Sequence, residues 1–128
     1  MRRVALDTNV LIGLLGNPEE YAERLADFDE IVLCPVVLGE FRAGLFDTKA
    51  GRENRKVLDL YLRNPSVRTS PMAASTAMLY AKIFQALKAK GRPIPTNDMW
   101  IAACALDAGV PLATDDNHFS SIPMLQLI

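Results

Sequence analysis

The sequence has few of the features that mark disulfide-rich, zinc-finger or membrane proteins. Its two cysteines, Cys34 and Cys104, lie inside apolar runs and lack the spacing of a metal site or a disulfide framework. We expect both to behave as small buried hydrophobes. No segment approaches the ~20 consecutive apolar residues of a membrane span. The chain reaches Asp7 too soon after Met1 for a signal peptide, so we expect a cytoplasmic protein.

An excess of one charge is also missing from the chain as a whole, although its parts differ. The formal net charge is −1 over 128 residues, which alone does not indicate a nucleic-acid partner. Residues 1–47 carry 4 basic and 9 acidic side chains, residues 48–95 carry 10 and 2, and residues 96–128 carry 0 and 4. Basic helices beside an acidic centre would suit a polyanion held by cations and metal ions. Alternatively, these basic side chains are ordinary solvated helix faces.

Half of the residues are apolar, which is enough for one domain with a core but leaves no room for a second. Short apolar runs predict strands, and apolar residues at helical spacing predict helices between them. The expected strands cover residues 4–6, 31–34, 67–69, 110–114 and 124–128. The expected helices cover residues 10–15, 18–28, 36–46, 51–63, 73–90 and 98–108. This alternation predicts one α/β domain over residues 1–128, with a central parallel sheet flanked by helices.

Acidic residues directly follow two of the expected strands. Asp7 follows the first strand, and Asp115 and Asp116 follow the fourth. Ligands of open α/β sheets bind beyond the carboxyl ends of the strands, where these acids fall. The alternative for Asp7 is a turn that caps the next helix, in which Asp7 or Asn9 bonds local backbone N–H groups.

Two further acids share a helix face with apolar residues. Glu40 follows Val36 and Val37 by one turn, and Asp98 precedes Ile101 by one turn. Asp98 also lies in the first turn of its helix, where the helix dipole favours a carboxylate. Acids on inward faces are costly unless they are paired, so both are candidates for a functional site.

If these acids converge, divalent cations are the natural counter-charge. Two carboxylates ~4 Å apart repel each other by about 1–4 kcal/mol. No lysine or arginine adjoins Asp7, Asp98 or Asp116 in the sequence to offset that repulsion. Mg²⁺ binds few carboxylates together with waters and substrate phosphates, so the pattern favours metal-assisted phosphodiester chemistry. Alternatively, each acid is satisfied locally by caps or backbone groups.

Four motifs, in order and over essentially the whole chain, resemble those of one enzyme family. They are Asp7-Thr8-Asn9, Gly39-Glu40-Phe41, the run from Pro95 to Ala103, and the run from Ala113 to Phe119. The sequence resembles the PIN-domain ribonucleases, in particular the VapC-type toxins of bacterial and archaeal toxin–antitoxin pairs. The resemblance implies a parallel sheet flanked by helices, and an endoribonuclease that uses one or two Mg²⁺ or Mn²⁺ ions and leaves a 5′-phosphate and a 3′-hydroxyl.

The resemblance also assigns residues and partners. It implies four catalytic acids that hold the metal: Asp7, Glu40, Asp98 and Asp116. It implies supporting residues beside the first and the fourth acid: Thr8, Asn9, Thr114 and Asp115. The family's Thr-x-Asp pattern selects Asp116 over its neighbour as the fourth acid. The implied partners are an RNA substrate, a second copy of the chain in a homodimer, and a small cognate antitoxin protein that covers the acidic groove.

Three residues near these motifs, and one alternative function, also bear on this interpretation. We expect His118, the only histidine, to fix its loop through a hydrogen bond rather than to act as an acid or base. Arg42 would contact RNA phosphate or pair with an acid, and Trp100 would be a core or dimer contact. The alternative function is a catalytically silent PIN-like scaffold that binds RNA or a protein. A complete set of four acids argues against that scaffold.

Two other classes of α/β protein lack a required residue here. A receiver-type signalling domain needs a lysine after a late strand, and residues 96–128 contain none. A phosphatase of the haloacid type needs a second aspartate two residues after the first, where this chain has Asn9. The sequence therefore excludes both.

Overall fold

Four parallel strands form the central sheet of the computed structural model, which describes residues 1–45 and 48–128. Their bounds are β1 Arg3–Leu6, β2 Glu30–Leu33, β3 Val67–Thr69 and β4 Leu112–Ala113. The strands lie in the order β3-β2-β1-β4, and each neighbouring pair is parallel. All four therefore end at the same edge of the sheet. The predicted parallel sheet is confirmed, and the run 67–69 is its edge strand.

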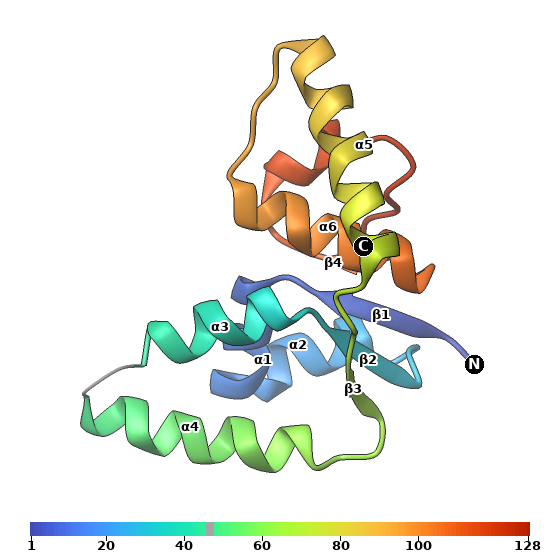
Figure 1. Ribbon diagram of the computed structural model, residues 1–128. Helices are drawn as coiled ribbons and strands as arrows, with labels where there is room; N and C mark the ends of the chain where they lie inside the picture. Colours follow the sequence, from blue (N-terminus) through green and yellow to red (C-terminus); the bar gives the residue numbers. More distant parts are fainter. Residues whose placement is uncertain (46–47) are drawn as a thin grey trace.

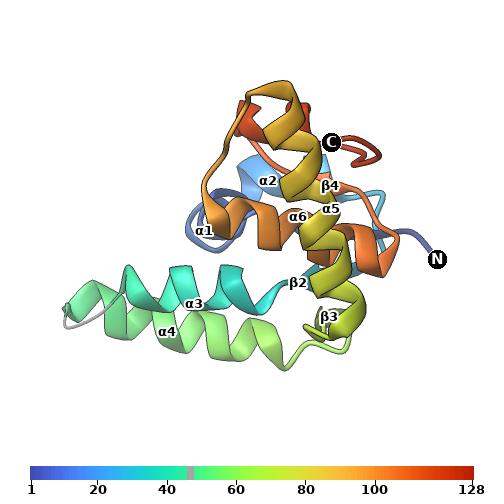
Figure 2. The same ribbon diagram turned by 45° about the horizontal axis from the view of Figure 1, so that its top comes forward.

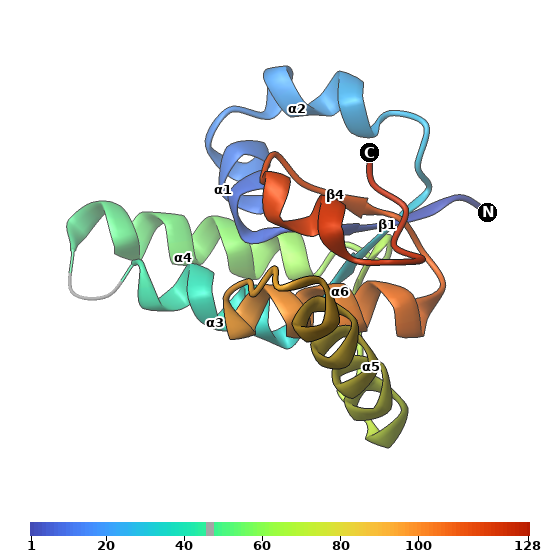
Figure 3. The same ribbon diagram turned by 90° about the horizontal axis from the view of Figure 1, so that it is seen from above.

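Helices cover both faces of this sheet. Their bounds are α1 Thr8–Gly16, α2 Pro18–Leu25, α3 Pro35–Ala43, α4 Lys49–Leu62, α5 Ala74–Lys90 and α6 Thr96–Ala108, followed by the 3₁₀-helix η1 Asn117–Ser121. Helices α1, α3 and α4 lie on one side, and α5 and α6 lie on the other (Figure 1, Figure 2). Seen from above, α5 crosses α6, while α3 and α4 extend together beyond the sheet (Figure 3). Within the described residues, no helix is long and apolar enough to cross a membrane.

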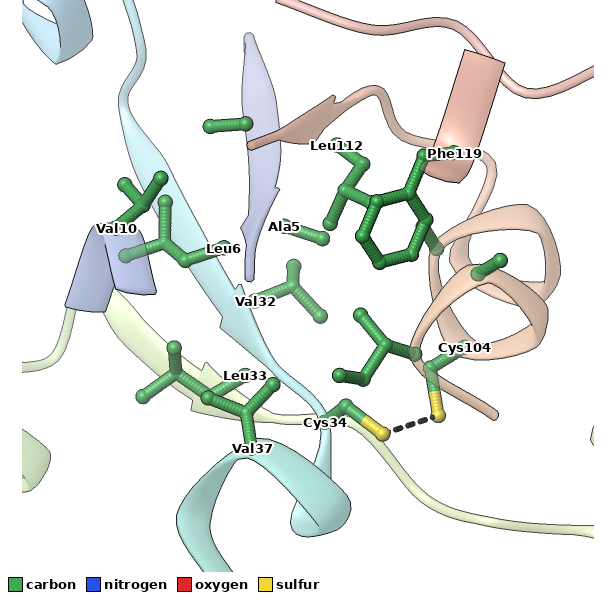
Figure 4. Close-up of a cluster of buried hydrophobic side chains, with 14 of the residues drawn as sticks. Ala5, Leu6, Val10, Val32, Leu33, Cys34, Val37, Cys104, Leu112 and Phe119 are labelled. Atoms are coloured by element: carbon green, nitrogen blue, oxygen red, sulfur yellow. Dashed lines mark hydrogen bonds between the residues drawn. The ribbon is translucent and has the colours of Figure 1, made fainter. Parts of the chain in front are cut away.

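The alternation of side chains along the strands builds two apolar layers. Leu6 and Leu33 point towards Val10 and Val37 on the side of α1 and α3 (Figure 4). Ala5, Val32 and Leu112 occupy neighbouring register positions and point towards α6, and Leu112 lies beside Phe119 of η1 (Figure 4). Most of these side chains are fully buried, and each large one contributes about 1.5–3 kcal/mol. The strand ends that carry the acids therefore rest on a rigid core.

Several element ends differ from the sequence prediction. Helix α1 begins at Thr8 rather than at residue 10, because the Asp7 carboxylate already caps it. Helix α2 ends at Leu25 rather than at residue 28, because the chain then turns and the Asp29 N–H bonds the Arg2 carbonyl beside β2. Helix α3 ends at Ala43, and its expected end at residue 46 lies outside the described residues.

The predicted strand over residues 124–128 is wrong. It is reduced to one parallel bridge between Leu112 and Leu127. Met124 has a φ of 65°, the left-handed conformation that interrupts an extended strand. The segment still lies along β4, since the Leu112 N–H bonds the Gln126 carbonyl at 2.9 Å. The fourth strand is also shorter than its apolar run and covers only two residues.

Candidate metal-binding active site

Asp7 stands directly after β1 and is almost fully buried, with 5% of its surface exposed. Its Oδ1 accepts a bond from the Thr8 N–H at 2.8 Å, which caps α1. Its Oδ2 accepts a bond from the Thr114 hydroxyl at 2.8 Å. The local cap that the sequence offered as an alternative thus engages one oxygen, while the end of β4 holds the other. Two independent contacts fix the carboxylate at the carboxyl edge of the sheet.

Glu40 reaches the same edge from α3. The Thr8 hydroxyl donates to its Oε1 at 2.7 Å, and the Asn97 amide donates to its Oε2 at 3.5 Å. The side chain of Thr8 therefore supports the second acid, whereas its backbone N–H supports the first. Asn9 is exposed and turned to solvent. Asn97 lies in the first turn of α6, and its contact with Glu40 is one that the sequence pattern does not predict.

Asp98 and Asp116 meet at His118. The His118 Nδ1 lies 3.3 Å from Asp98 Oδ2 and 3.2 Å from Asp116 Oδ1. Asp116 also caps η1, because its Oδ1 accepts the His118 N–H at 2.9 Å. Ligand atoms of these three residues lie within 4.8 Å of one another. The expectation that His118 fixes its loop by hydrogen bonding is met, and its contact with Asp98, 20 residues away, is new.

Burial and mutual repulsion shift the pKa values of two of these acids, Asp7 and Asp98. Desolvation raises the pKa of Asp7 above its ordinary value, and the charges of Asp116 and Glu40 raise it further. The bonds from Thr114 and Thr8 lower that pKa in part. Desolvation likewise raises the pKa of Asp98, with the hydrogen bond from His118 opposing it. The charges of Asp7 and Asp116 also raise the pKa of Asp98. Asp7 and Asp98 are thus each affected by the charges of two other acids of the site.

Asp115 turns away from this cluster. Its carboxylate pairs with Arg24 of α2, and the Tyr21 hydroxyl donates to it at 3.5 Å. The same Arg24 donates to the carbonyls of Thr114 and Ile128, each at 2.8 Å. The Thr114 hydroxyl in turn accepts the Asp116 N–H at 3.0 Å. Asp115 therefore helps to anchor the loop after β4, while its neighbour faces the other acids.

Arg42 and Trp100, for which the sequence allowed more than one role, both have partners within the chain. Arg42 pairs with Asp59 on α4 at 2.9 Å, so of its two alternatives the pairing with an acid is the one seen here. Trp100 stacks on Tyr80 of α5, with ring centroids 4.1 Å apart. Trp100 therefore packs where α5 crosses α6, although it follows Asp98 closely in the sequence.

The donor set fits a hard divalent cation. It consists of carboxylate oxygens and one imidazole nitrogen, and Mg²⁺ and Mn²⁺ prefer oxygen ligands. Within residues 1–45 and 48–128, no lysine or arginine pairs with Asp7, Glu40, Asp98 or Asp116. Within the described residues, His118 is therefore the only basic side chain that contacts the cluster.

Comparison with known proteins identifies the family of this chain. A family model described as PIN domain matches residues 4–124. Ribonuclease VapC1 of Haemophilus influenzae strain R2866 is 31% identical over 126 residues, which cover 94% of this chain and 92% of that protein. Ribonuclease VapC4 of Mycobacterium tuberculosis is 29% identical over 130 residues, which cover 100% of this chain and 97% of that protein.

Solved structures agree in fold. The structure of VapBC-1 from nontypeable Haemophilus influenzae matches with a TM-score of 0.85 and 30% identity, over 98% of this chain and 96% of that one. The crystal structure of VapBC2 from Rickettsia felis, bound to a DNA fragment from its promoter, matches with a TM-score of 0.84 and 26% identity. That match covers 98% of this chain and 97% of the other.

Proposed function

Because the chain belongs to the VapC group of the PIN-domain family, we propose that it is an endoribonuclease and the toxin of a toxin–antitoxin pair. We propose further that it depends on Mg²⁺ or Mn²⁺. The observation that supports this proposal is the convergence of four acids, from four separate segments, at one edge of the sheet. In the part of the chain that the structure describes, no lysine or arginine pairs with them. Such a cluster is costly unless cations or a ligand compensate its charge.

We propose that Asp7, Glu40, Asp98 and Asp116 hold the ion. A bound divalent ion supplies Lewis-acid activation of water and neutralises charge on the phosphate. Asp7 is suited to this task because two hydrogen bonds fix both of its oxygens. Asp98 and Asp116 are suited to it because they approach the same imidazole. His118 either remains their hydrogen-bond donor or joins them as a nitrogen ligand.

The proposed roles of the supporting residues follow from their contacts. Thr8 and Thr114 orient carboxylates, since each donates its hydroxyl to one of the acids. We propose Asp116 rather than Asp115 as the fourth acid, because Asp115 pairs with Arg24 outside the cluster. Asn9 has no comparable support for a role here, since its side chain is exposed.

The proposed partners are an RNA substrate, an antitoxin protein and a second copy of the chain. The antitoxin rests on the VapBC structures that this chain resembles. The homodimer and the cytoplasmic location rest on family resemblance. Light scattering of the purified protein, alone and with a candidate antitoxin protein, tests both assemblies. A protein that remains a monomer and does not bind the antitoxin would contradict them.

RNA cleavage by the purified protein tests the proposed activity. Wild type, Asp7→Asn and Asp27→Asn are incubated with structured and unstructured RNAs in Mg²⁺, Mn²⁺ or EDTA. Asp27 is a matched control, because its side chain is 83% exposed on the surface. We expect wild type and Asp27→Asn to cleave only with metal, and Asp7→Asn to be inactive.

The scaffold function makes the opposite prediction in the same experiment. A scaffold would bind RNA equally well with EDTA and would cleave none of the RNAs. Cleavage that persists in both EDTA and Asp7→Asn would contradict the metal site itself.

A further inference from the structure

The two cysteines form a pair that the proposed metal site does not use. Cys34 is the residue before α3, and Cys104 lies within α6, 70 positions later. Their sulfur atoms face each other 2.9 Å apart, with the Cys34 thiol as the donor (Figure 4). Both thiols are free and buried. Two sulfurs this close need to approach by less than ~1 Å to reach the ~2.05 Å of a disulfide bond.

An open cavity reaches Cys104 from the β3 edge of the sheet. It has a volume of about 340 Å³, and its lining includes Cys104, Arg68 and Ser70. The Ser70 hydroxyl is buried beside the Cys104 thiol. A cavity of this size, with a hydroxyl beside a thiol, has the room and polarity to admit a molecule as small as a peroxide.

The two thiols are chemically unequal. The hydrogen bond from Cys34 lowers the pKa of the Cys104 thiol in spite of its burial. The same bond, together with burial, raises the pKa of the Cys34 thiol. Cys104 lines the cavity and Cys34 does not, so a small oxidant reaches Cys104 first. Since the thiolate is the reactive form, the lowered pKa agrees with Cys104 as the attacking group and Cys34 as the group that resolves the product.

We propose that Cys34 and Cys104 are a redox-sensitive dithiol that hydrogen peroxide converts into a reversible disulfide. The Cys104 thiolate attacks one peroxide oxygen, so that an S–O bond forms, the O–O bond breaks, and the departing hydroxide takes a proton to become water. The Cys34 sulfur then attacks the Cys104 sulfur. The S–S bond forms, the S–O bond breaks, and the second hydroxide leaves as water with the Cys34 proton. The pair loses two electrons, which reduce the peroxide.

The disulfide would join the start of α3 to α6. These are the two helices that carry Glu40 and Asp98, so the bond would tie together both sides of the acidic cluster. It would also close a long loop and restrict the unfolded chain. We therefore expect oxidation to raise the melting temperature by on the order of 10 °C.

The test treats the folded, reduced, full-length protein with hydrogen peroxide and follows free thiols, mass and melting temperature. The chain has only two cysteines, so an intramolecular disulfide can only be this pair. We expect both thiols to disappear together with the loss of two hydrogens, and dithiothreitol to restore both thiols and the original melting temperature. The proposal is overturned if both thiols survive until denaturant is added, or if only links between chains form.

Two single variants test the order of attack. In Cys34→Ala, Cys104 should stop at the sulfenic acid, which dimedone traps. In Cys104→Ala, Cys34 should react at least tenfold more slowly with peroxide. Circular dichroism checks that both variants fold. The test on the wild-type protein does not depend on either variant. Equal rates for the two single thiols would refute Cys104 as the attacking group.

Discussion

Thr114→Val tests whether the Thr114 hydroxyl orients the first acid. This hydroxyl donates to Asp7 Oδ2 at 2.8 Å and accepts the Asp116 N–H at 3.0 Å. Thr114 is itself buried at the end of β4. Valine matches threonine in shape, so the substitution removes both hydrogen bonds without leaving a large cavity.

The expected cost follows from these two bonds. A hydrogen bond to a charged group contributes about 1.5–3 kcal/mol, and an ordinary one contributes about 1 kcal/mol. We therefore expect Thr114→Val to lower the free energy of unfolding by about 3 kcal/mol. At roughly 4 °C per kcal/mol for a chain of this size, the melting temperature should fall by on the order of 10 °C.

Thermal unfolding in EDTA, by circular dichroism, measures this effect without bound metal. Thr114→Ser is the matched control, because it keeps the hydroxyl and should lose far less. The Thr114 bond lowers the pKa of Asp7, so it stabilises the charged carboxylate. The difference between valine and wild type should therefore shrink at acid pH, where Asp7 is protonated. A valine variant that melts within ~2 °C of wild type at neutral pH would refute the reasoning.

Three further predictions concern stability in the metal-free protein. Burial raises the pKa values of Asp7 and Asp98, so the folded state retains protons that the unfolded state releases. Urea titrations should therefore show the free energy of unfolding falling as pH rises from the ordinary carboxyl range through these raised values. Arg24→Gln should lose about 1–2 kcal/mol in the same assay, because three contacts to the loop after β4 and the last residue disappear. Gly51→Ala should lose at least about 2 kcal/mol, since its Cβ would lie 1.9 Å from a backbone carbonyl oxygen, whereas Gly39→Ala, in open space within α3, should gain up to about 1 kcal/mol.

The sequence was most informative where local pattern and tertiary role coincide. The apolar run before Asp7 had to be a strand, and its acid had to fall at the strand's carboxyl end. Asp98 was placed correctly in the first turn of α6, because Ile101 and Ala102 mark the buried face of that helix. In each case a few adjacent residues carry the signal, so the local pattern predicts which strand or helix places the acid.

The remaining features depend on contacts between distant segments. Nothing near Asp115 predicts its pairing with Arg24, 91 residues earlier, and nothing near Cys34 predicts that Cys104 lies against it. The final segment does not form the predicted strand. Met124 adopts a left-handed backbone conformation and, among the described residues, only one bridge, between Leu112 and Leu127, follows it. Such features follow from how the layers pack against one another. A single sequence does not encode them in any local pattern.

The adjacent pair Asp115 and Asp116 offers the most direct test of the central claim, that the converging acids form a metal site for RNA cleavage. Mn²⁺ binding by calorimetry and Mn²⁺-dependent RNA cleavage are compared in Asp115→Asn and Asp116→Asn. Each variant loses one carboxylate, but only the second loses one that faces the cluster. We predict that Asp116→Asn lowers cleavage by at least about a hundredfold and weakens Mn²⁺ binding, while Asp115→Asn stays within about tenfold of wild type. Equal losses in both variants, or full activity in Asp116→Asn, would contradict the account.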